Sequence, residues 1–240
     1  MRTLPDQNYR PQTASRGSTH DAETLFERVW EYREEVLYPR LFGNGARGIF
    51  PIPYDLFATT FKQADVDPRW LHYGIFEFAP TSERASWVYV TSGMSTPWDD
   101  DQPDPDGVSG LGCEFVFEST AQGDWAIRRL WQLMAYQVLL FHDRYPGHSP
   151  LATFDRLPLR SSIWDKASEI RTLMLAPPDA GLGMQRLESG SFSLAHVVGI
   201  TEVEAAYARA HDGVALLDQL RAEGAFPVTD PARRSIQIRD

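Results

Sequence analysis

Cysteine is nearly missing from this sequence, because Cys113 is the single one in 240 residues. No disulfide can form within the chain, which excludes the covalent support on which small secreted domains depend. Long apolar runs are missing too: no stretch of ~20 apolar residues occurs, and Met1 to Ser18 contain no apolar segment typical of a signal peptide. These absences predict a protein of a reducing compartment, the cytoplasm, with no membrane partner.

Lysine and net positive charge are also scarce. Lys62 and Lys166 are the only lysines among 23 basic residues, and the formal net charge is -10. Binding to a nucleic-acid backbone requires a basic face that releases counterions, so this charge balance argues against a nucleic-acid partner. The prevalence of arginine suits bidentate pairing with carboxylates, although coding bias alone would give the same composition.

Apolar and aromatic residues are plentiful, at 42% and 12% of the chain, which is enough for a packed core. The length allows one large domain or two small ones. Residues 1–20 are polar, contain Pro5, Pro11 and Gly17, and show no hydrophobic periodicity, which predicts a flexible N-terminal arm. No repeat or domain-sized linker interrupts residues 21–240, so they are predicted to form one domain.

The first folded element is predicted to be an amphipathic helix over 21–38. Its apolar residues, from Leu25 to Leu37, form one stripe at helical spacing. Asp21 is suitably placed to cap the N-terminus of this helix. Pro39 is placed to stop it.

Strands are predicted next. Two apolar runs, 70–78 and 87–90, are separated by a polar turn, which indicates a hairpin. In 111–118, apolar residues alternate with other types at a period of two, as in a strand with one buried face. That alternation places Cys113 on the buried face.

The remainder mixes both types of element. A helix is predicted over 124–142, with Asp124 as its N-cap. Two more strands and two short helices are predicted at 170–175, 192–200, 202–209 and 214–223. Because strands and helices do not alternate strictly, the pattern favours an α+β fold, a mixed or antiparallel sheet with packed helices, over a doubly wound parallel sheet.

Catalytic and metal-binding motifs are incomplete. In Gly93-Met94-Ser95-Thr96-Pro97 a serine follows a strand, but a nucleophile elbow requires glycine where this chain has Pro97. Cys113 could act as a nucleophile with His142 or His148, yet a cysteine on a buried strand face is more often a small core residue. The six histidines show no pair at metal-ligand spacing. The sequence therefore predicts no catalytic centre, no metal site and no cofactor.

An acidic segment, Asp99 to Gly107, separates the hairpin from the third strand. It lacks the ligand spacing of a calcium loop, although weak Ca²⁺ binding stays open. A solvated charge run is one interpretation; the other is a docking surface with Trp98 as an exposed aromatic anchor beside acids that attract a basic partner. On the second interpretation, the candidate partner-binding residues are Trp98, Asp99, Asp100, Asp101, Asp104 and Asp106.

Two groups of sequence blocks carry a family resemblance. The first group is Trp87–Ser95 (WVYVTSGMS), Ser109–Phe117 (SGLGCEFVF) and the helix from Trp125 to Tyr136. The second group is Val197–Glu204 (VVGITEVE), Val228–Asp230 (VTD) and Arg233–Ile236 (RRSI). In this order and with these gaps the blocks resemble the suppressor-of-fused family, over roughly Asp21 to Ile236.

The resemblance implies an α+β domain of the family's amino-terminal type that binds a protein partner and is not an enzyme. Eukaryotic members bind zinc-finger transcription factors of the Hedgehog pathway by clamping an extended peptide between two domains. By position, Trp98 and Asp106 match an aromatic and an acidic residue of that family. Because the sequence ends at Asp240, no second domain is expected, and the transcription-factor role is not carried over.

Single-domain relatives are bacterial, and for them the resemblance implies an immunity protein that neutralises a toxin. The leading hypothesis is therefore a cytoplasmic binding protein whose partner, a peptide or a toxin domain, docks near the Trp98–Gly110 loop and an adjacent sheet edge. Two alternatives stay open. One is an enzyme with acid–base chemistry at Glu114, His142, Asp143 and His148, and the other is a homodimeric scaffold that pairs through a sheet edge.

Overall fold

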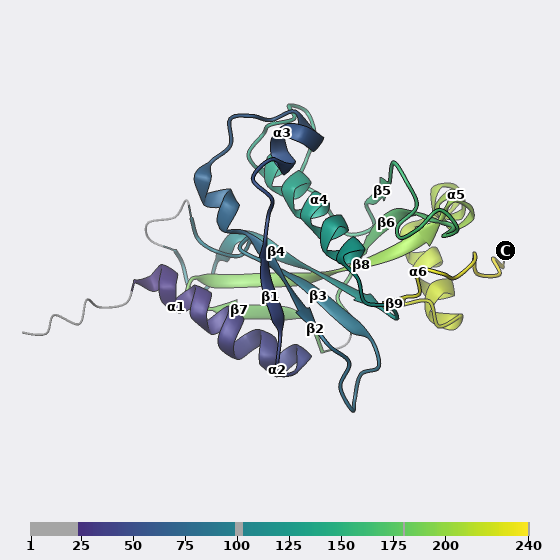
Figure 1. Cartoon of the computed structure of the whole chain (residues 1–240), viewed down its shortest axis with the longest axis horizontal. Helices are drawn as coiled ribbons and strands as arrows, with labels where there is room; N and C mark the ends of the chain where they lie inside the picture. The colour runs from purple at the N-terminus through teal and green to yellow at the C-terminus, as the bar shows by residue number, and fades with distance from the viewer. Residues whose placement is uncertain (1–23, 99–102, 180, 240) are drawn as a thin grey trace, which may run out of the picture.

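The computed structural model describes residues 24–98, 103–179 and 181–239. Within these ranges, strands form a single nine-stranded sheet with helices on both faces (Figure 1). The strands are β1 (Arg47–Pro51), β2 (Gly74–Phe78), β3 (Trp87–Ser92), β4 (Val108–Ser119), β5 (Arg156–Pro158), β6 (Ile170–Ala176), β7 (Met184–Leu187), β8 (Gly190–Thr201) and β9 (Val228–Thr229). The helices are α1 (Leu25–Glu31), the π-helical η1 (Tyr32–Leu37), α2 (Tyr38–Phe42), α3 (Leu56–Phe61), the 3-10 helix η2 (Pro68–His72), α4 (Asp124–Phe141), α5 (Glu202–Ala210) and α6 (Gly213–Ala222).

The sheet is mixed. Its strand order is β1-β2-β3-β4-β8-β6-β5, with β7 also paired to β8 and β9 to β4. β4 runs parallel to β8 and to β9, whereas the other neighbours are antiparallel. This arrangement confirms the predicted α+β class, and it makes the long strands β4 and β8 the centre of the molecule.

Three buried clusters hold the helices on the sheet. α4 covers one face, where Leu130 belongs to the same cluster as Phe115 and Phe117 of β4. The α1–η1–α2 stretch covers the opposite face, where Val29 belongs to a cluster with Val116. Since successive strand residues point to opposite faces, one strand serves both cores. α5 and α6 pack on the far ends of β6 and β8.

The first helical stretch differs from the prediction at both ends. Its N-cap is Thr24, which forms a capping box with Glu27, and the predicted cap Asp21 lies outside the described residues. Pro39 does not stop the stretch: it lies in the first turn of α2, directly after η1. Proline lacks an N–H and is tolerated in a first helical turn, so the change from π-helical to α-helical turns accommodates it.

Two other boundaries were predicted wrongly. The strand expected at 70–78 begins only at Gly74, because Asp67 caps a 3-10 turn that occupies the preceding residues. The N-cap of α4 is Gly123, and Asp124 is its first helical residue, where a carboxylate still favours the helix dipole.

The remaining long elements confirm their predictions. The hairpin β2–β3, the strand β4, the helix α4, the strands β6 and β8, and the helices α5 and α6 all occur where the sequence pattern indicated. The short elements β1, α3, β5, β7 and β9 were not predicted. The predicted N-terminal arm lies outside the described residues. None of the helices in the described ranges is long and apolar enough to cross a membrane.

Candidate functional site

Trp98 lies where β3 leads, through the turn Gly93–Pro97, into the acidic segment. Its N–H donates to the Thr96 carbonyl at 2.9 Å, and its own carbonyl accepts from Arg69 Nη1 at 2.7 Å. The side chain is partly buried, so the expectation of an exposed aromatic anchor is wrong as regards exposure. The backbone contacts hold Trp98 at a defined place on the surface.

Trp98 belongs to an aromatic cluster with Phe26 and Trp30 of α1 and His72 of η2. Its ring centroid lies 4.2 Å from that of Phe26, 6.2 Å from that of Trp30 and 6.0 Å from that of His72. These are ordinary distances for packed aromatic rings. The indole Nε1 of Trp98 is buried and has no hydrogen-bond partner among the described residues.

A small groove opens beside this cluster, and we call it the Trp98 groove. Its volume is about 180 Å³. It is lined by Tyr73, Thr96, Pro97, Trp98, Val108, Gly110, Leu111 and Phe141. Val108 and Phe141 are 68% and 45% exposed, so two large apolar side chains of the lining face solvent. A ligand pocket for a small molecule usually measures ~300–1,000 Å³, so this groove has room for only one or two side chains.

A buried polar network lies beneath the surface beside the Trp98 groove and fixes the turn that precedes Trp98. Arg33 of η1 is fully buried, and it donates from Nε to Ser92 Oγ at 3.0 Å. Its Nη1 donates to Ser95 Oγ at 3.1 Å and to Thr96 Oγ1 at 2.9 Å. Glu34 is the nearest carboxylate, at 3.6 Å from Nη2, and burial raises the pKa of Glu34 against the opposing effect of Ser92 and Arg33. The network ties the helix η1 to the turn before Trp98.

Glu114 of β4 completes this network from the sheet side. It is fully buried, and its Oε1 accepts from the Gly93 N–H at 3.0 Å, the Ser95 N–H at 2.8 Å and the Ser95 hydroxyl at 2.8 Å. Its Oε2 accepts from the Thr91 hydroxyl at 2.6 Å. Four donors thus satisfy the buried carboxylate of Glu114. These hydrogen bonds fix the conformation of the Gly93–Pro97 turn and leave no free carboxylate oxygen to act as a base.

Gly110 lets β4 approach this turn closely. A Cβ at Gly110 would lie 2.5 Å from the carbonyl oxygens of both Met94 and Thr96, and its φ of +56° is left-handed. The neighbouring Leu111 N–H donates to the Met94 carbonyl at 2.7 Å. Glycine is therefore required here by both space and conformation.

The predicted acidic site residues are only partly described. Asp104 and Asp106 are exposed: Asp104 Oδ1 accepts from the Asp106 N–H at 2.9 Å, and Asp106 pairs with Arg186 of β7 at 2.6 Å. An exposed pair of this kind contributes ~0–1 kcal/mol. Asp99, Asp100 and Asp101 lie outside the described residues.

The two candidate nucleophiles, Ser95 and Cys113, both have structural roles. Ser95 donates to Glu114 and accepts from Arg33, so its hydroxyl serves the buried network. Cys113 packs against the α4 core, and burial raises the pKa of its thiol to about 12. A thiol with such a pKa is protonated near neutral pH and is a poor nucleophile. These contacts support the core interpretation of Cys113.

The four residues of the enzyme hypothesis occupy different environments. Glu114 lies inside the sheet, whereas the His142 ring packs on Trp70 with a centroid distance of 4.9 Å. Asp143 and His148 are exposed beyond the end of α4. Within the described ranges, no group of three or more His, Cys, Asp or Glu side chains is arranged to hold a metal ion.

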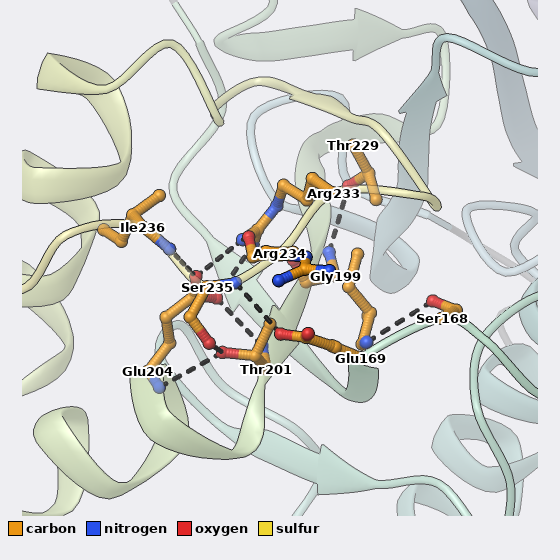
Figure 2. Close-up of polar contacts among 11 residues, drawn as sticks. Ser168, Glu169, Gly199, Thr201, Glu204, Thr229, Arg233, Arg234, Ser235 and Ile236 are labelled. Atoms are coloured by element: carbon orange, nitrogen blue, oxygen red, sulfur yellow. Dashed lines mark hydrogen bonds and ion pairs between the residues drawn. The ribbon is translucent and has the colours of Figure 1, made fainter.

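The C-terminal sequence blocks meet in a second polar network, which Figure 2 shows. Glu204 of α5 is fully buried and accepts from Arg233 at 2.6 and 2.8 Å, while Arg233 also donates to the Gly199 carbonyl at 2.8 Å. The N–H groups of Thr201 and Ile236 donate to the same carboxylate, each at 2.8 Å. The Glu204 carboxylate is satisfied within the chain, whereas the buried Nε of Arg233 has no hydrogen-bond partner among the described residues. The network therefore anchors residues 230–236 to α5 and β8.

Sequence reasoning missed Arg33 and the groove. The sequence did contain a signal for the burial of Arg33. Arg33 lies four residues after Val29 and four residues before Leu37, so it falls in the apolar stripe of the first helix. A cation at a stripe position indicates a buried polar partner. The groove had no such signal, because its lining comes from segments far apart in the sequence.

Comparisons with known proteins agree with this fold. A sequence model of the suppressor of fused protein family matches residues 69–234. The crystal structure of Drosophila Suppressor of Fused has 18% identity and a TM-score of 0.55, over 79% of this chain and 52% of that one. This chain thus spans about half the length of the Drosophila protein. No significant match was found among curated protein sequences.

Two further structures are similar. The Sufu–Fu complex has 20% identity and a TM-score of 0.53, over 77% of this chain and 93% of that one. A putative suppressor of fused homolog from Neisseria gonorrhoeae has 20% identity and a TM-score of 0.50, over 70% of this chain and 80% of that one. At such identities the structures establish the fold alone. Together with the sequence match over 69–234, they show that this chain belongs to the suppressor of fused protein family.

Proposed function

We propose that this chain is a non-enzymatic binding domain that captures a protein partner at the Trp98 groove. The observation that carries the proposal is a groove of about 180 Å³ whose rim exposes Val108 and Phe141. A groove of this size fits one or two apolar side chains of a peptide, and exposed apolar residues beside it are typical of interaction sites. The buried network of Arg33 and Glu114 keeps the groove preformed, which lowers the entropic cost of binding.

Two findings outside the groove support a protein partner. One similar structure is that of a Sufu–Fu complex. The acidic residues Asp104 and Asp106 flank the groove in sequence, and the chain carries a net charge of -10. Such a charge accelerates association with a basic partner and gives it specificity.

The finer proposal concerns the kind of partner. A basic toxin domain, neutralised in the cytoplasm, is our candidate, because the negative charge complements it and the single cysteine suits a reducing compartment. A peptide strand from another basic protein would use the same groove. In both cases Trp98, Asp104 and Asp106 contact the partner together with Val108 and Phe141.

The test uses variants at the rim, because Trp98 also packs against α1 and its removal would disturb folding. Tagged wild-type protein and the variants Val108→Glu and Phe141→Glu are used to capture partners from the native cytoplasm, followed by mass spectrometry. Val203→Glu is the control, since Val203 is 57% exposed on α5. We expect one stoichiometric partner with wild type and with Val203→Glu, and a loss of ~2 kcal/mol or more in binding free energy for the rim variants.

Other outcomes would contradict the proposal. Equal capture by all four proteins would show that the partner docks elsewhere. If sedimentation shows a dimer that the rim variants dissociate, the groove serves a second copy of this chain, and the homodimeric scaffold replaces the capture of a foreign protein.

A further inference from the structure

A second and larger cavity lies along α4, apart from the Trp98 groove. Its volume is about 640 Å³, within the ~300–1,000 Å³ of small-molecule sites. The walls come from the end of α3, from α4 and from β5, which lie near one another in Figure 1. The two cavities share no lining residue. This cavity is therefore independent of the proposed protein-binding site.

The charge of the cavity is opposite to that of the whole chain. Lys62, Arg129, Arg156 and Arg160 line it, against a single carboxylate, Asp155. We call it the basic cavity. Among the described residues, none of these four cations forms an ion pair, although arginines elsewhere in the chain do so repeatedly. In a chain with net charge -10, a concentration of unneutralised cations around one cavity indicates an anionic ligand.

Neutral acceptors hold three of the four cations in place. Arg129 donates to the carbonyls of Ser162 and Ile163 at 2.6 and 3.3 Å, and burial lowers its pKa. Arg156 Nη1 donates to the Ala208 carbonyl at 3.0 Å, and Lys62 Nζ to a carbonyl of α3 at 2.9 Å. Carbonyl acceptors orient these side chains but leave their charge available.

Aromatic rings form another part of the wall. Phe61 and Tyr136 are stacked, with centroids 6.2 Å apart and ring planes at 7°, and Tyr136 contacts Tyr145 at 5.8 Å. The Tyr145 hydroxyl donates to the Phe61 carbonyl at 3.1 Å, which fixes the arrangement. The leucines of the lining are Leu133, Leu151, Leu157, Leu159 and Leu173. Flat aromatic and apolar surfaces beside cations suit a ligand that has both a planar ring and an anionic group.

The adjacent sheet edge is poorly suited to a peptide strand. β5 is the last strand of the sheet path and is only three residues long, and it ends in Pro158. Proline has no N–H to donate to an added strand. We propose that the basic cavity binds a small organic anion of the nucleotide class, with its phosphates at Lys62 and Arg160 and its planar ring on the Phe61–Tyr136 stack.

Isothermal titration of the full chain tests this inference with three probes: ATP, adenosine and pyrophosphate. We expect saturable binding of ATP and at least about tenfold weaker binding of either part alone, because ring and phosphate each contribute. The variant Lys62→Gln/Arg160→Gln should weaken ATP binding about tenfold or more, since it removes two charge-assisted contacts. Both residues are exposed, so the variant is expected to fold.

The control is Lys166→Gln/Arg40→Gln, which removes one lysine and one arginine that are exposed and do not line the cavity. It should bind ATP within about twofold of wild type. The inference is overturned if ATP shows no saturable binding, if both double variants lose affinity equally, or if pyrophosphate binds as tightly as ATP. Binding of a hexaglutamate peptide without binding of ATP would also overturn it, in favour of an acidic protein segment.

Discussion

Glu204 and Arg233 form a buried ion pair at the junction of α5, β8 and the C-terminal segment. The guanidinium is 11% exposed and the carboxylate is fully buried. Glu204→Ala would leave the Arg233 charge buried without its partner, so we expect the free energy of unfolding to fall by about 3–5 kcal/mol. Urea unfolding followed by tryptophan fluorescence measures the loss.

Glu202→Ala provides the comparison for this prediction. Glu202 lies on the same helix and pairs with Arg209 at 3.1 Å, but both partners are exposed. We expect this variant to change stability by no more than about 0.5–1 kcal/mol. Equal losses in the two variants would show that the C-terminal network contributes little.

His196 of β8 is another buried ionisable residue, and its environment disfavours charge. Neither ring nitrogen has a hydrogen-bond partner among the described residues, and the ring packs on Phe226 at 5.2 Å. Burial lowers the pKa of His196 to about 4, against the opposing effect of Asp179. Glu118 lies 3.8 Å away, and burial raises its pKa.

These pKa shifts predict how stability depends on pH. An unfolded histidine titrates near 6.5, so between about pH 6.5 and pH 4 the unfolded chain binds a proton that folded His196 does not. The free energy of unfolding is therefore highest above pH 6.5 and decreases as the pH falls, and at pH 4 the decrease that His196 causes is about 3 kcal/mol. Glu118 has the opposite sign, because its raised pKa makes the folded state take up a proton first, and it offsets part of this loss.

The variant His196→Leu isolates the histidine contribution. Unfolding free energies of wild type and variant are measured by urea titration at several values between about pH 7 and pH 4. We expect wild type to lose more stability over this range than the variant. His148→Leu, at an exposed position, should follow wild type. If His196→Leu retains the full pH dependence of wild type, the buried imidazole is not its source.

At the scale of elements, the close approach of β4 to the Gly93–Pro97 turn depends on Gly110. Alanine at Gly110 would bring its Cβ to 2.5 Å from two backbone carbonyl oxygens in a left-handed conformation. We therefore expect Gly110→Ala to lower the free energy of unfolding by more than about 2 kcal/mol. Thermal unfolding followed by circular dichroism is the measurement.

Gly147→Ala separates the steric contribution from the conformational one. Gly147 has a φ of +82°, but no atom lies within 4 Å of a Cβ placed there. The expected loss is about 1 kcal/mol, from the left-handed conformation alone. If Gly110→Ala is no more harmful than Gly147→Ala, the turn before Trp98 can move away from β4 at little cost.

The elements also show which parts of this fold a sequence can predict. α4, β4, β8, α5 and α6 were predictable because each contains enough residues for a clear period of 3.6 or two. β9 has only two residues, and it pairs with β4 at Glu118 and Ser119, far away in the sequence. No local pattern can predict such a contact. The same limit applies to β5 and β7.

The candidate site was predictable in part for a similar reason. The family resemblance indicated Trp98, but the partial burial of its ring depends on Phe26 and Trp30, which approach it only after α1 has packed on the sheet. The period of two in β4 correctly placed Cys113. The same alternation predicted an exposed face for Glu114. Glu114 is nevertheless buried, because helices cover both faces of β4.

For the whole molecule, the central strands connect the three buried clusters. Leu173 and Leu175 of β6 belong to the α4 cluster, while Met174 between them belongs to the α5–α6 cluster. Phe115 and Val116 of β4 divide in the same way between the α4 cluster and the α1–η1–α2 cluster. If one cluster were lost, one face of a central strand would be exposed, and the same strand also contributes residues to another cluster. The clusters are therefore expected to unfold cooperatively.

We therefore expect residues 21–240 to unfold as one domain, although single domains of this size often populate intermediates. Urea transitions followed by far-ultraviolet circular dichroism, tryptophan fluorescence and labelling of the Cys113 thiol should share one midpoint. Cys113 is a sensitive reporter, because it is the only cysteine and packs against the α4 cluster. If hydrogen exchange shows α5 and α6 opening at lower urea concentration than α4, the C-terminal cluster is a separate folding unit, and the Glu204–Arg233 pair would be stabilising that unit alone.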